Sequence, residues 1–540
     1  MSSIKPNFAF QALLAISCSY FLIMVLLGID RHWSFKTSIY DTGVYDQVIW
    51  NYIHESIPAS SIGKIAMPYN WLGIHFNPIL LFLFVPLYKL YPSPEWLILA
   101  QSFAIVSTTL PLYKTALRLN YSDWQAFLGS LAFLLNPFVI SAIQWDFHPV
   151  AIATPVIAWS IYFLLIDDFK KLLLSIIILL LIQEQFGIVV ICLGLTYYIT
   201  YRRPKKSLFI VGIGVIYTFV LFQYVFPALS PTGSHVMLSS EFKTISRYNW
   251  LGGSIIEVFI HCFSSPLTIF KKMLIEMEGY RYIILLLLPY GMIFPCLGIE
   301  ILLIGLADFA INALSLLEMQ RSILSYHSVT LIPIIIIAAM IGYKRFIKFS
   351  PTMLCRMAIV ATASAFFILF MISFPVLLGK NSVWILSPFP VKNPELSKIK
   401  KLIPENAALS VQVNIGPHFS QRKFLYSYPY NINTVDYILL RIEDPNGLLK
   451  DNSFRFIKHN GMDQKNYLTS IKCLLGSGKF RIEYFNPPWL ILNKSSAPSD
   501  NYKDSSVINY LKVLEKRWEV ENIKLNQNSC NWTKWTQQML

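Results

Sequence analysis

The sequence predicts a mainly α-helical membrane protein. We expect about eleven transmembrane helices, interfacial helices in the first external loop, and a small extramembrane α/β domain at the C-terminus. Of the 540 residues, 55% are hydrophobic and only 14% are charged, whereas about a quarter of a soluble domain is charged. Apolar runs of about 18 residues, long enough to span a bilayer as helices, recur from residue 8 to residue 376. The rest of the chain mixes polar and apolar residues and has no such run.

The domain boundary follows from this change of pattern. We expect a polytopic transmembrane domain over residues 1–379 and an extracytoplasmic α/β domain over residues 380–540. The N-terminal apolar run shows no small-residue cleavage site. It is therefore expected to remain as the first span and not to be removed as a signal peptide.

The formal net charge of +15 could suggest a nucleic-acid partner. The basic residues, however, gather at the ends of the apolar runs, as the positive-inside rule describes for the plasma membrane. We therefore expect a lipid bilayer as partner and no nucleic acid. The seven cysteines show no metal-ligand spacing. Cys473 and Cys530 could pair in the C-terminal domain, but sequence alone does not establish a disulfide.

The predicted spans share apolar character near membrane length. They are residues 8–29, 96–117, 124–142, 148–166, 170–183, 185–201, 207–228, 281–297, 299–315, 327–343 and 353–376. We divide 170–201 at Gln183-Glu184-Gln185, because one charge and two amides would otherwise lie at mid-membrane depth.

The short run 76–91 decides the topology. It has about 15 residues and two prolines, which is short for a crossing. If it lies in the interface or re-enters, all basic connections fall on the side of the N-terminus; if it crosses, the first three switch to the outside. These connections are Lys114/Arg118, Lys170/Lys171, Arg202/Arg203/Lys205/Lys206 and Lys344/Arg345/Lys348. The positive-inside rule favours the first alternative. It places the N-terminus in the cytoplasm, and loops 30–95 and 229–280 and the C-terminal domain outside.

Two extramembrane regions show patterns of their own. Loop 229–280 contains an amphipathic stretch, Ile255 to Phe270, that is expected to lie on the membrane surface. In the C-terminal domain, residues 408–413, 437–441 and 480–484 have the composition of strands, and residues 506–521 read as an exposed helix.

Two carboxylates, Asp41 and Asp46, follow the first span on either side of Gly43. Asp46 could begin a helix over 46–56, where the helix dipole favours an anion. Asp41 is therefore the better candidate for a catalytic base. The alternative is that one or both are cap residues in a solvated loop.

Three further candidates lie at the predicted outer face. Asp146 and His148 directly precede a span; together they could bind a metal or relay a proton, or they could form a simple helix start with an aromatic belt. Glu184 is the one carboxylate in some 30 mostly apolar residues. It is either a functional intramembrane acid or the tip of a loop.

Two basic residues complete the candidates. The predicted topology puts His75, which lies beside Asn77 and Pro78, on the same membrane face as the acids. Arg321 could hold an anionic group such as phosphate. Both could instead be structural. The set suits general-base chemistry on a lipid-linked anionic substrate, and it equally suits ion- or proton-coupled transport.

Several strings resemble a known family of prokaryotic membrane proteins, catalogued as domain of unknown function 2079. The resemblance covers roughly residues 35–440. It rests on Tyr40-Asp41-Thr42-Gly43-Val44-Tyr45-Asp46-Gln47-Val48-Ile49-Trp50, His75-Phe76-Asn77-Pro78, Asp146-Phe147-His148-Pro149, Glu184-Gln185-Phe186-Gly187 and Pro417-His418-Phe419-Ser420-Gln421-Arg422 with Tyr426 and Pro429. Many relatives have Lys-Glu-Asp where this chain has Gln183-Glu184-Gln185, so only Glu184 stays a candidate there.

This family is similar to the GT-C superfamily of polytopic glycosyltransferases. The resemblance implies a GT-C-like fold, a polyprenyl-phosphate sugar as co-substrate, and a catalytic acid in the first external loop. By position that acid is Asp41, with Asp46 next, and Asp146 matches a second acidic position. The sites we expect are thus Asp41, Asp46 and Asp146 as catalytic residues and His75, His148, Glu184 and Arg321 as substrate-binding residues. A divalent metal is a candidate cofactor, on Asp146 and His148.

The sequence thus favours a membrane glycosyltransferase that acts at the outer face. Two other classes remain open: a transporter or flippase of lipid-linked substrates, and a non-catalytic membrane scaffold. The sugar, the acceptor and the oligomeric state are not indicated.

Overall fold

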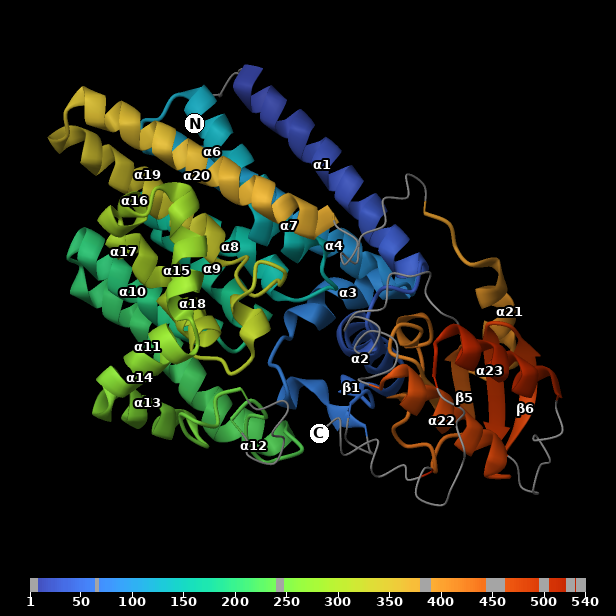
Figure 1. Cartoon of the computed structure of the whole chain (residues 1–540). Coiled ribbons are helices and arrows are strands. Elements are labelled where there is room, and N and C mark those ends of the chain that lie inside the picture. The colour runs from blue at the N-terminus through green and yellow to red at the C-terminus, as the bar shows by residue number, and fades with distance from the viewer. Residues whose placement is uncertain are drawn as a thin grey trace. The chain divides into compact units, whose positions relative to one another are not determined.

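The computed structural model describes residues 8–63, 68–238, 247–378, 390–442, 462–494, 505–520 and 530. It divides into two compact units. Unit 1 comprises Met1–Gly28, Leu72–Leu83 and Glu95–Gly379, and unit 2 comprises Ile29–Trp71, Phe84–Pro94 and Lys380–Leu540. Figure 1 labels many of their elements.

Unit 1 is built of helices. They are α4 (Glu95–Ser107), α5 (Thr109–Arg118), α6 (Asp123–Leu134), α7 (Pro137–Gln144), α8 (Val150–Leu165), α9 (Phe169–Ile182), α10 (Phe186–Tyr201), α11 (Pro204–Val220), α12 (Phe226–Leu229), α13 (Ile255–Ser264), α14 (Pro266–Lys271), α15 (Gly279–Leu287), α16 (Ile293–Leu297), α17 (Ile299–Leu302), α18 (Leu306–Ala313), α19 (Leu331–Phe349) and α20 (Thr352–Leu378). Helices α1 (Phe8–Trp33) and α3 (Ile79–Leu90) each have residues in both units.

The helical architecture confirms the predicted membrane class. Among the described residues, four helical stretches are long and apolar enough to cross a membrane: Phe8–Trp33, Glu95–Arg118, Pro204–Leu229 and Thr352–Ser373. The bent pairs α6/α7 and α13/α14 raise this number to six if each pair forms one span. The count of eleven spans stays a prediction, because several apolar runs form helices that are shorter or broken.

The predicted division at Gln183-Glu184-Gln185 is confirmed, since α9 ends at Ile182 and α10 begins at Phe186. In contrast, the run 281–297 is interrupted after α15. Pro289 lacks an amide hydrogen and Gly291 has a positive φ of 78°, so a continuous helix cannot pass through. Helix α3 has only 12 residues, about 18 Å of helix, which is shorter than a bilayer core.

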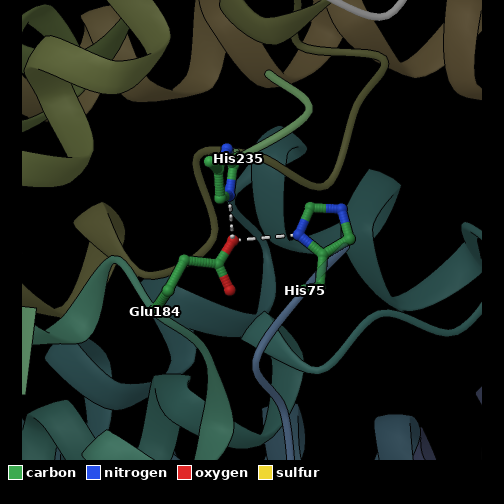
Figure 2. A group of neighbouring side chains, drawn as sticks. All are labelled: His75, Glu184 and His235. Carbon is green, nitrogen blue, oxygen red and sulfur yellow. Dashed lines mark hydrogen bonds and ion pairs between the residues drawn. The ribbon is translucent and has the colours of Figure 1, made fainter. Parts of the chain in front are cut away.

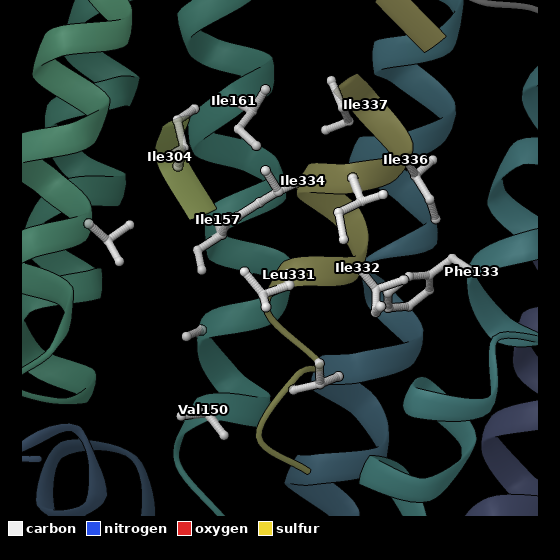
Figure 3. Close-up of a cluster of buried hydrophobic side chains, with 14 of the residues drawn as sticks. Phe133, Val150, Ile157, Ile161, Ile304, Leu331, Ile332, Ile334, Ile336 and Ile337 are labelled. Atoms are coloured by element: carbon white, nitrogen blue, oxygen red, sulfur yellow. The ribbon is translucent and has the colours of Figure 1, made fainter. Parts of the chain in front are cut away.

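The core of unit 1 surrounds α19. All residues from Leu331 to Ala338 in this helix are buried, and their isoleucine side chains pack against α8 and Ile304 (Figure 3). A helix that is apolar on all sides packs either against other helices or against lipid, and here the burial of Leu331 to Ala338 shows packing against other helices. The isoleucine run of α19 is therefore the centre of unit 1.

Unit 2 contains a five-stranded mixed sheet with the strand order β4-β3-β5-β7-β6. Strands β3 (Leu409–Val411), β4 (Leu425–Ser427) and β5 (Tyr437–Arg441) are parallel, whereas β7 (Trp489–Lys494) pairs antiparallel with β5 and β6 (Phe480–Asn486). The remaining elements are α2 (Val44–Glu55), α21 (Pro394–Leu402), α22 (Gln464–Gly476), α23 (Ser505–Arg517) and the short strands β1 (Ala59–Ser60) and β2 (Tyr69–Asn70).

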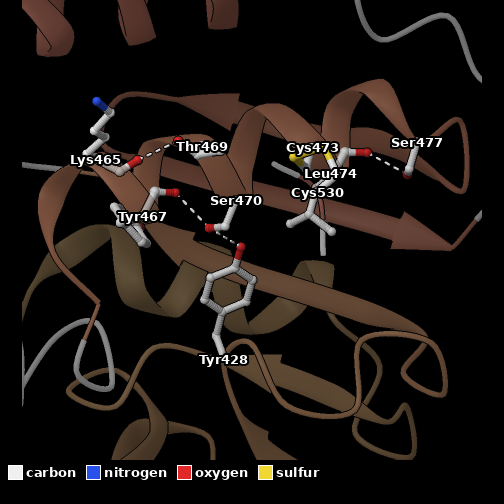
Figure 4. Close-up of a disulfide and its surroundings, with 9 residues drawn as sticks. All are labelled: Tyr428, Lys465, Tyr467, Thr469, Ser470, Cys473, Leu474, Ser477 and Cys530. Atoms are coloured by element: carbon white, nitrogen blue, oxygen red, sulfur yellow. Dashed lines mark hydrogen bonds between the residues drawn. A yellow bond between two sulfur atoms is a disulfide. The ribbon is translucent and has the colours of Figure 1, made fainter. Parts of the chain in front are cut away.

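The three predicted strands and the C-terminal helix are confirmed, and β4 and β7 were not predicted. The expectation that the C-terminal helix is exposed is wrong for one face. Val507, Leu511 and Leu514 of α23 are buried in the core of unit 2, because their spacing puts them on one side of the helix. Cys473 of α22 forms a disulfide with Cys530 (Figure 4).

Candidate functional site

A buried cluster of ionisable side chains lies at the break between α9 and α10 (Figure 2). Oε1 of Glu184 is 2.9 Å from Nδ1 of His75 and 3.4 Å from Nε2 of His235. The backbone N–H of Phe76 donates to Oε2 of Glu184 at 3.0 Å. One carboxylate thus joins three segments of unit 1.

The local fold explains why these groups meet. Gln183 has extended backbone angles, which stops α9 and turns Glu184 out of the helix. His75 precedes α3, and His235 follows α12, where its ring stacks on Phe222 and meets Phe226 edge-on. Burial by itself would raise the pKa of Glu184, but the two histidines outweigh this effect and hold its pKa below the usual range. The buried Glu184 side chain is therefore expected to be ionised.

A second buried carboxylate, Asp308 of α18, lies beyond the same break. It accepts hydrogen bonds from Nε2 of Gln185 at 3.0 Å and from the hydroxyl of Thr330 at 2.6 Å. The sequence analysis missed both Asp308 and His235. An acid inside the predicted span 299–315 was a usable signal for Asp308, whereas nothing in the spacing of the chain pointed to His235.

The segment with Asp146 and His148 is held in place by Gln101 of α4. The side-chain amide of Gln101 donates to the carbonyl oxygen of Trp145 at 2.8 Å, and its oxygen accepts the backbone N–H of His148 at 3.0 Å. The His148 ring stacks on Tyr326, with ring centroids 3.5 Å apart. Its Nδ1 lies 2.9 Å from the carbonyl oxygen of Asp146. Both predicted residues are buried.

Metal-ligand geometry favours a different place from the predicted one. Within the described part of the chain, the group of three or more His, Cys, Asp or Glu side chains with converging ligand atoms is His75, Glu184 and His235. Asp146 and His148 do not belong to such a group. Metal binding at Asp146 and His148 stays a prediction.

Arg321 lines a pocket of about 340 Å³ in unit 1. Its Nη1 donates to the carbonyl oxygen of Ser315 at 2.6 Å, which fixes the half-buried guanidinium. The pocket also contains Arg281, which pairs with Glu278 at 2.6 Å. The other lining residues are Met277, Tyr282, Leu285, Glu318, Ser322, Ile323, Leu324, Ile372 and Ser373. Two arginines, two glutamates and several apolar groups thus line one cavity.

Asp41 and Asp46 belong to unit 2 and have different environments. Asp41 lies in a short π-turn, Ile39–Gly43, and is half-buried. Asp46, in the first turn of α2, is completely buried. Its carboxylate accepts hydrogen bonds from Tyr88 at 2.8 Å, Ser420 at 2.5 Å and Gln421 at 3.2 Å. Burial raises the pKa of Asp46 to about 6, although the three hydrogen bonds oppose the rise.

The two motifs that carry the family resemblance interlock within unit 2. The side-chain amide of Gln47 donates to the carbonyl oxygen of Arg422 at 2.9 Å, next to the bonds between Asp46 and residues 420 and 421. A Cβ added at Gly416 would lie 2.4 Å from Ile39. Residues some 375 positions apart therefore depend on each other, which gives Asp46 a structural role that the sequence did not reveal.

Comparisons with known proteins give one family and a group of similar solved structures, which includes two structures of ArnT. ArnT from Cupriavidus metallidurans bound to undecaprenyl phosphate has 13% sequence identity and a TM-score of 0.48, with 91% of this chain and 99% of that chain covered. Apo ArnT has 12% identity and a TM-score of 0.45, with 89% and 98% covered. No curated protein matches the chain.

The family model described as "Predicted membrane protein (DUF2079)" matches residues 31–484. This range includes Asp41, Asp46, the Glu184 cluster, Arg321 and strands β3, β4 and β5 of unit 2. It confirms the predicted resemblance and the membrane location: the chain belongs to the DUF2079 family of membrane proteins.

Proposed function

We propose that this protein is a membrane glycosyltransferase that transfers a sugar from a polyprenyl-phosphate donor at the outer face of the membrane. The observation that carries the proposal is the pocket around Arg321. A lipid-linked phosphate has an anionic head and an apolar tail, and the pocket offers a fixed guanidinium beside Leu285, Ile323 and Ile372. Arginine binds phosphate through two parallel N–H donors, which a fixed guanidinium can present without losing further side-chain entropy.

The general base in this proposal is Asp41. Asp46 is less suited, because its carboxylate already accepts three side-chain hydrogen bonds and is completely buried. Asp41 takes the proton of the acceptor hydroxyl, the acceptor oxygen bonds to the anomeric carbon, and the polyprenyl phosphate leaves with the bonding electrons. Arg321 stabilises the charge that develops on the leaving phosphate. Asp146 and His148, which Gln101 and Tyr326 fix in place, position the acceptor.

Binding of the lipid phosphate tests the proposal first. We expect undecaprenyl phosphate to bind the purified full-length protein, and Arg321→Gln to weaken binding by about 10- to 100-fold, the loss of a charge-assisted hydrogen bond. Arg281→Gln is the matched control: its guanidinium is exposed and already paired with Glu278, so we expect a change below about threefold. Equal affinities of the Arg321 variant and the wild type would contradict the proposal.

Transfer itself is measured in proteoliposomes with radiolabelled polyprenyl-phosphate sugars. Asp41→Asn should abolish sugar transfer while leaving lipid binding unchanged. Sugar transfer by the Asp41→Asn protein at the wild-type rate would remove Asp41 as the base.

A transporter of lipid-linked substrates is the second candidate. The observation that favours it is the broken helix pair α9/α10 with Glu184 at the break, since discontinuous helices and buried acids mark ion and substrate sites in transporters. The same proteoliposomes separate the two functions. A transporter would move the intact donor across the bilayer, whereas a glycosyltransferase would release polyprenyl phosphate.

A further inference from the structure

We propose that His75, Glu184 and His235 bind a divalent cation of the zinc type. This inference is independent of the proposed glycosyltransferase activity. It also places the metal on residues other than Asp146 and His148. Three steps support it: the donor set, the spacing of the donor atoms, and the surroundings that hold them.

Two imidazoles and one carboxylate form a donor set that zinc uses in proteins, and three protein ligands leave a fourth position open. The ligand atoms here all lie within 4.8 Å of one another. A tetrahedral zinc ion with bonds of about 2.0–2.1 Å separates its ligand atoms by about 3.3 Å. The distances of 2.9 and 3.4 Å from Glu184 to the histidines match this spacing. The distance between the histidines needs to close by at most roughly 1.5 Å.

Neighbouring residues hold the three metal-ligand side chains in place. The N–H of Phe76 holds Oε2 of Glu184, so Oε1 faces both histidines (Figure 2). Phe222 and Phe226 enclose the ring of His235. Such an outer shell orients metal ligands and excludes water. The ligands come from three separate segments, so a cation would tie the stretch after α12 to the α9/α10 break.

Metal binding has one local cost. The N–H of Met237 lies 3.3 Å from Nδ1 of His235, so the proton of the neutral ring sits on Nε2 and faces Glu184. A cation bound at Nε2 shifts this proton to Nδ1. The long contact to Met237 then opens, and the strong interaction of the cation with an anionic carboxylate offsets its loss.

The first test is metal content. Purified full-length protein is stripped with chelator and dialysed against zinc, and bound zinc is counted by elemental mass spectrometry. We expect one zinc per chain in the wild type and in His148→Ala. We expect Glu184→Gln and His235→Ala to bind at least about 100-fold more weakly, since loss of an outer-shell partner alone costs 10- to 100-fold. Wild type without zinc, or zinc lost in His148→Ala and kept in His235→Ala, would overturn the proposal.

A second variant guards against misfolding. His235→Cys replaces one zinc ligand by another, so it should retain zinc. With cobalt(II) in place of zinc, it should show a thiolate-to-cobalt absorption band in the near ultraviolet that the wild type lacks. Absence of this band in a monodisperse His235→Cys protein would show that residue 235 does not face the cation, and would equally refute the site.

Discussion

Asp46, a predicted catalytic residue, has the environment of a structural anchor in unit 2. Its carboxylate joins α2 to Tyr88, Ser420 and Gln421 and is shielded from water. Breaking such a buried network leaves donors without an acceptor, which costs more than the hydrogen bonds contribute. We prefer Asp41 as the proposed base because the Asp46 carboxylate already accepts three side-chain hydrogen bonds.

The raised pKa of Asp46 predicts a pH dependence of stability. Its pKa is about 6 in the folded protein and 3.8 ordinarily, so the folded state binds the proton more tightly than the unfolded state. This contribution to stability is complete below pH 3.8 and is lost as the pH rises through 6. Asp46→Asn does not titrate. We expect the free energy of unfolding of the wild type, relative to Asp46→Asn, to fall by roughly 2 kcal/mol between about pH 4.5 and about pH 7.5.

Thermal unfolding of both proteins in the same detergent across this pH range measures the difference. Ser420→Ala gives a directional check. The Ser420 hydroxyl lowers the pKa of Asp46, so its removal should move the pH-dependent step upward. A difference between wild type and Asp46→Asn that does not change with pH would show that Asp46 does not titrate with a raised pKa.

At the scale of elements, the pair α10/α11 depends on glycines that allow close approach. A Cβ added at Gly214 of α11 would lie 2.6 Å from the carbonyl oxygen of Gly187 and 2.9 Å from the amide nitrogen of Ile191, both in α10. A Cβ added at Gly212 would meet nothing within 4 Å. Small residues at helix contacts are a general means of packing helices in membranes.

These two glycines give a matched pair of variants. We expect Gly214→Ala to destabilise the protein by about 1–3 kcal/mol, because backbone atoms of α10 must move. Gly212→Ala should be neutral or stabilise by up to about 1 kcal/mol, since alanine favours the helix over glycine. The readout is the midpoint of thermal unfolding for each variant in the same detergent. Equal destabilisation by both substitutions would contradict close packing at Gly214.

The same elements show what sequence can and cannot predict. Apolar runs predict the helices well, and the charge at Gln183-Glu184-Gln185 predicted the break between α9 and α10. The break between α15 and α16 was missed because Pro289 and Gly291 interrupt the helix within an otherwise continuous apolar run. The two carboxylates at the end of the first span were recognisable, but their environments depend on residues 420 and 421. His235 was missed because it meets Glu184 only through tertiary folding.

At the scale of the whole molecule, the disulfide bears on topology. Disulfides form and persist outside the cytosol, so the bond between Cys473 and Cys530 supports the proposal that residues 380–540 are extracytoplasmic. It is independent of the positive-inside argument, which uses only charges beside the apolar runs. The two arguments agree, and a count of thiols tests the disulfide directly.

Cys18, Cys192, Cys262, Cys296 and Cys355 are free thiols. The denatured, unreduced protein should therefore take up five polyethylene-glycol maleimides, and all seven cysteines should react after reduction. Cys473→Ser frees Cys530, so this control has six thiols with or without reductant. Seven reactive thiols in the unreduced wild type would refute the disulfide. A membrane-impermeant reductant added to intact cells should raise the wild-type count only if unit 2 faces outward, because the reductant cannot reach a disulfide in the cytoplasm.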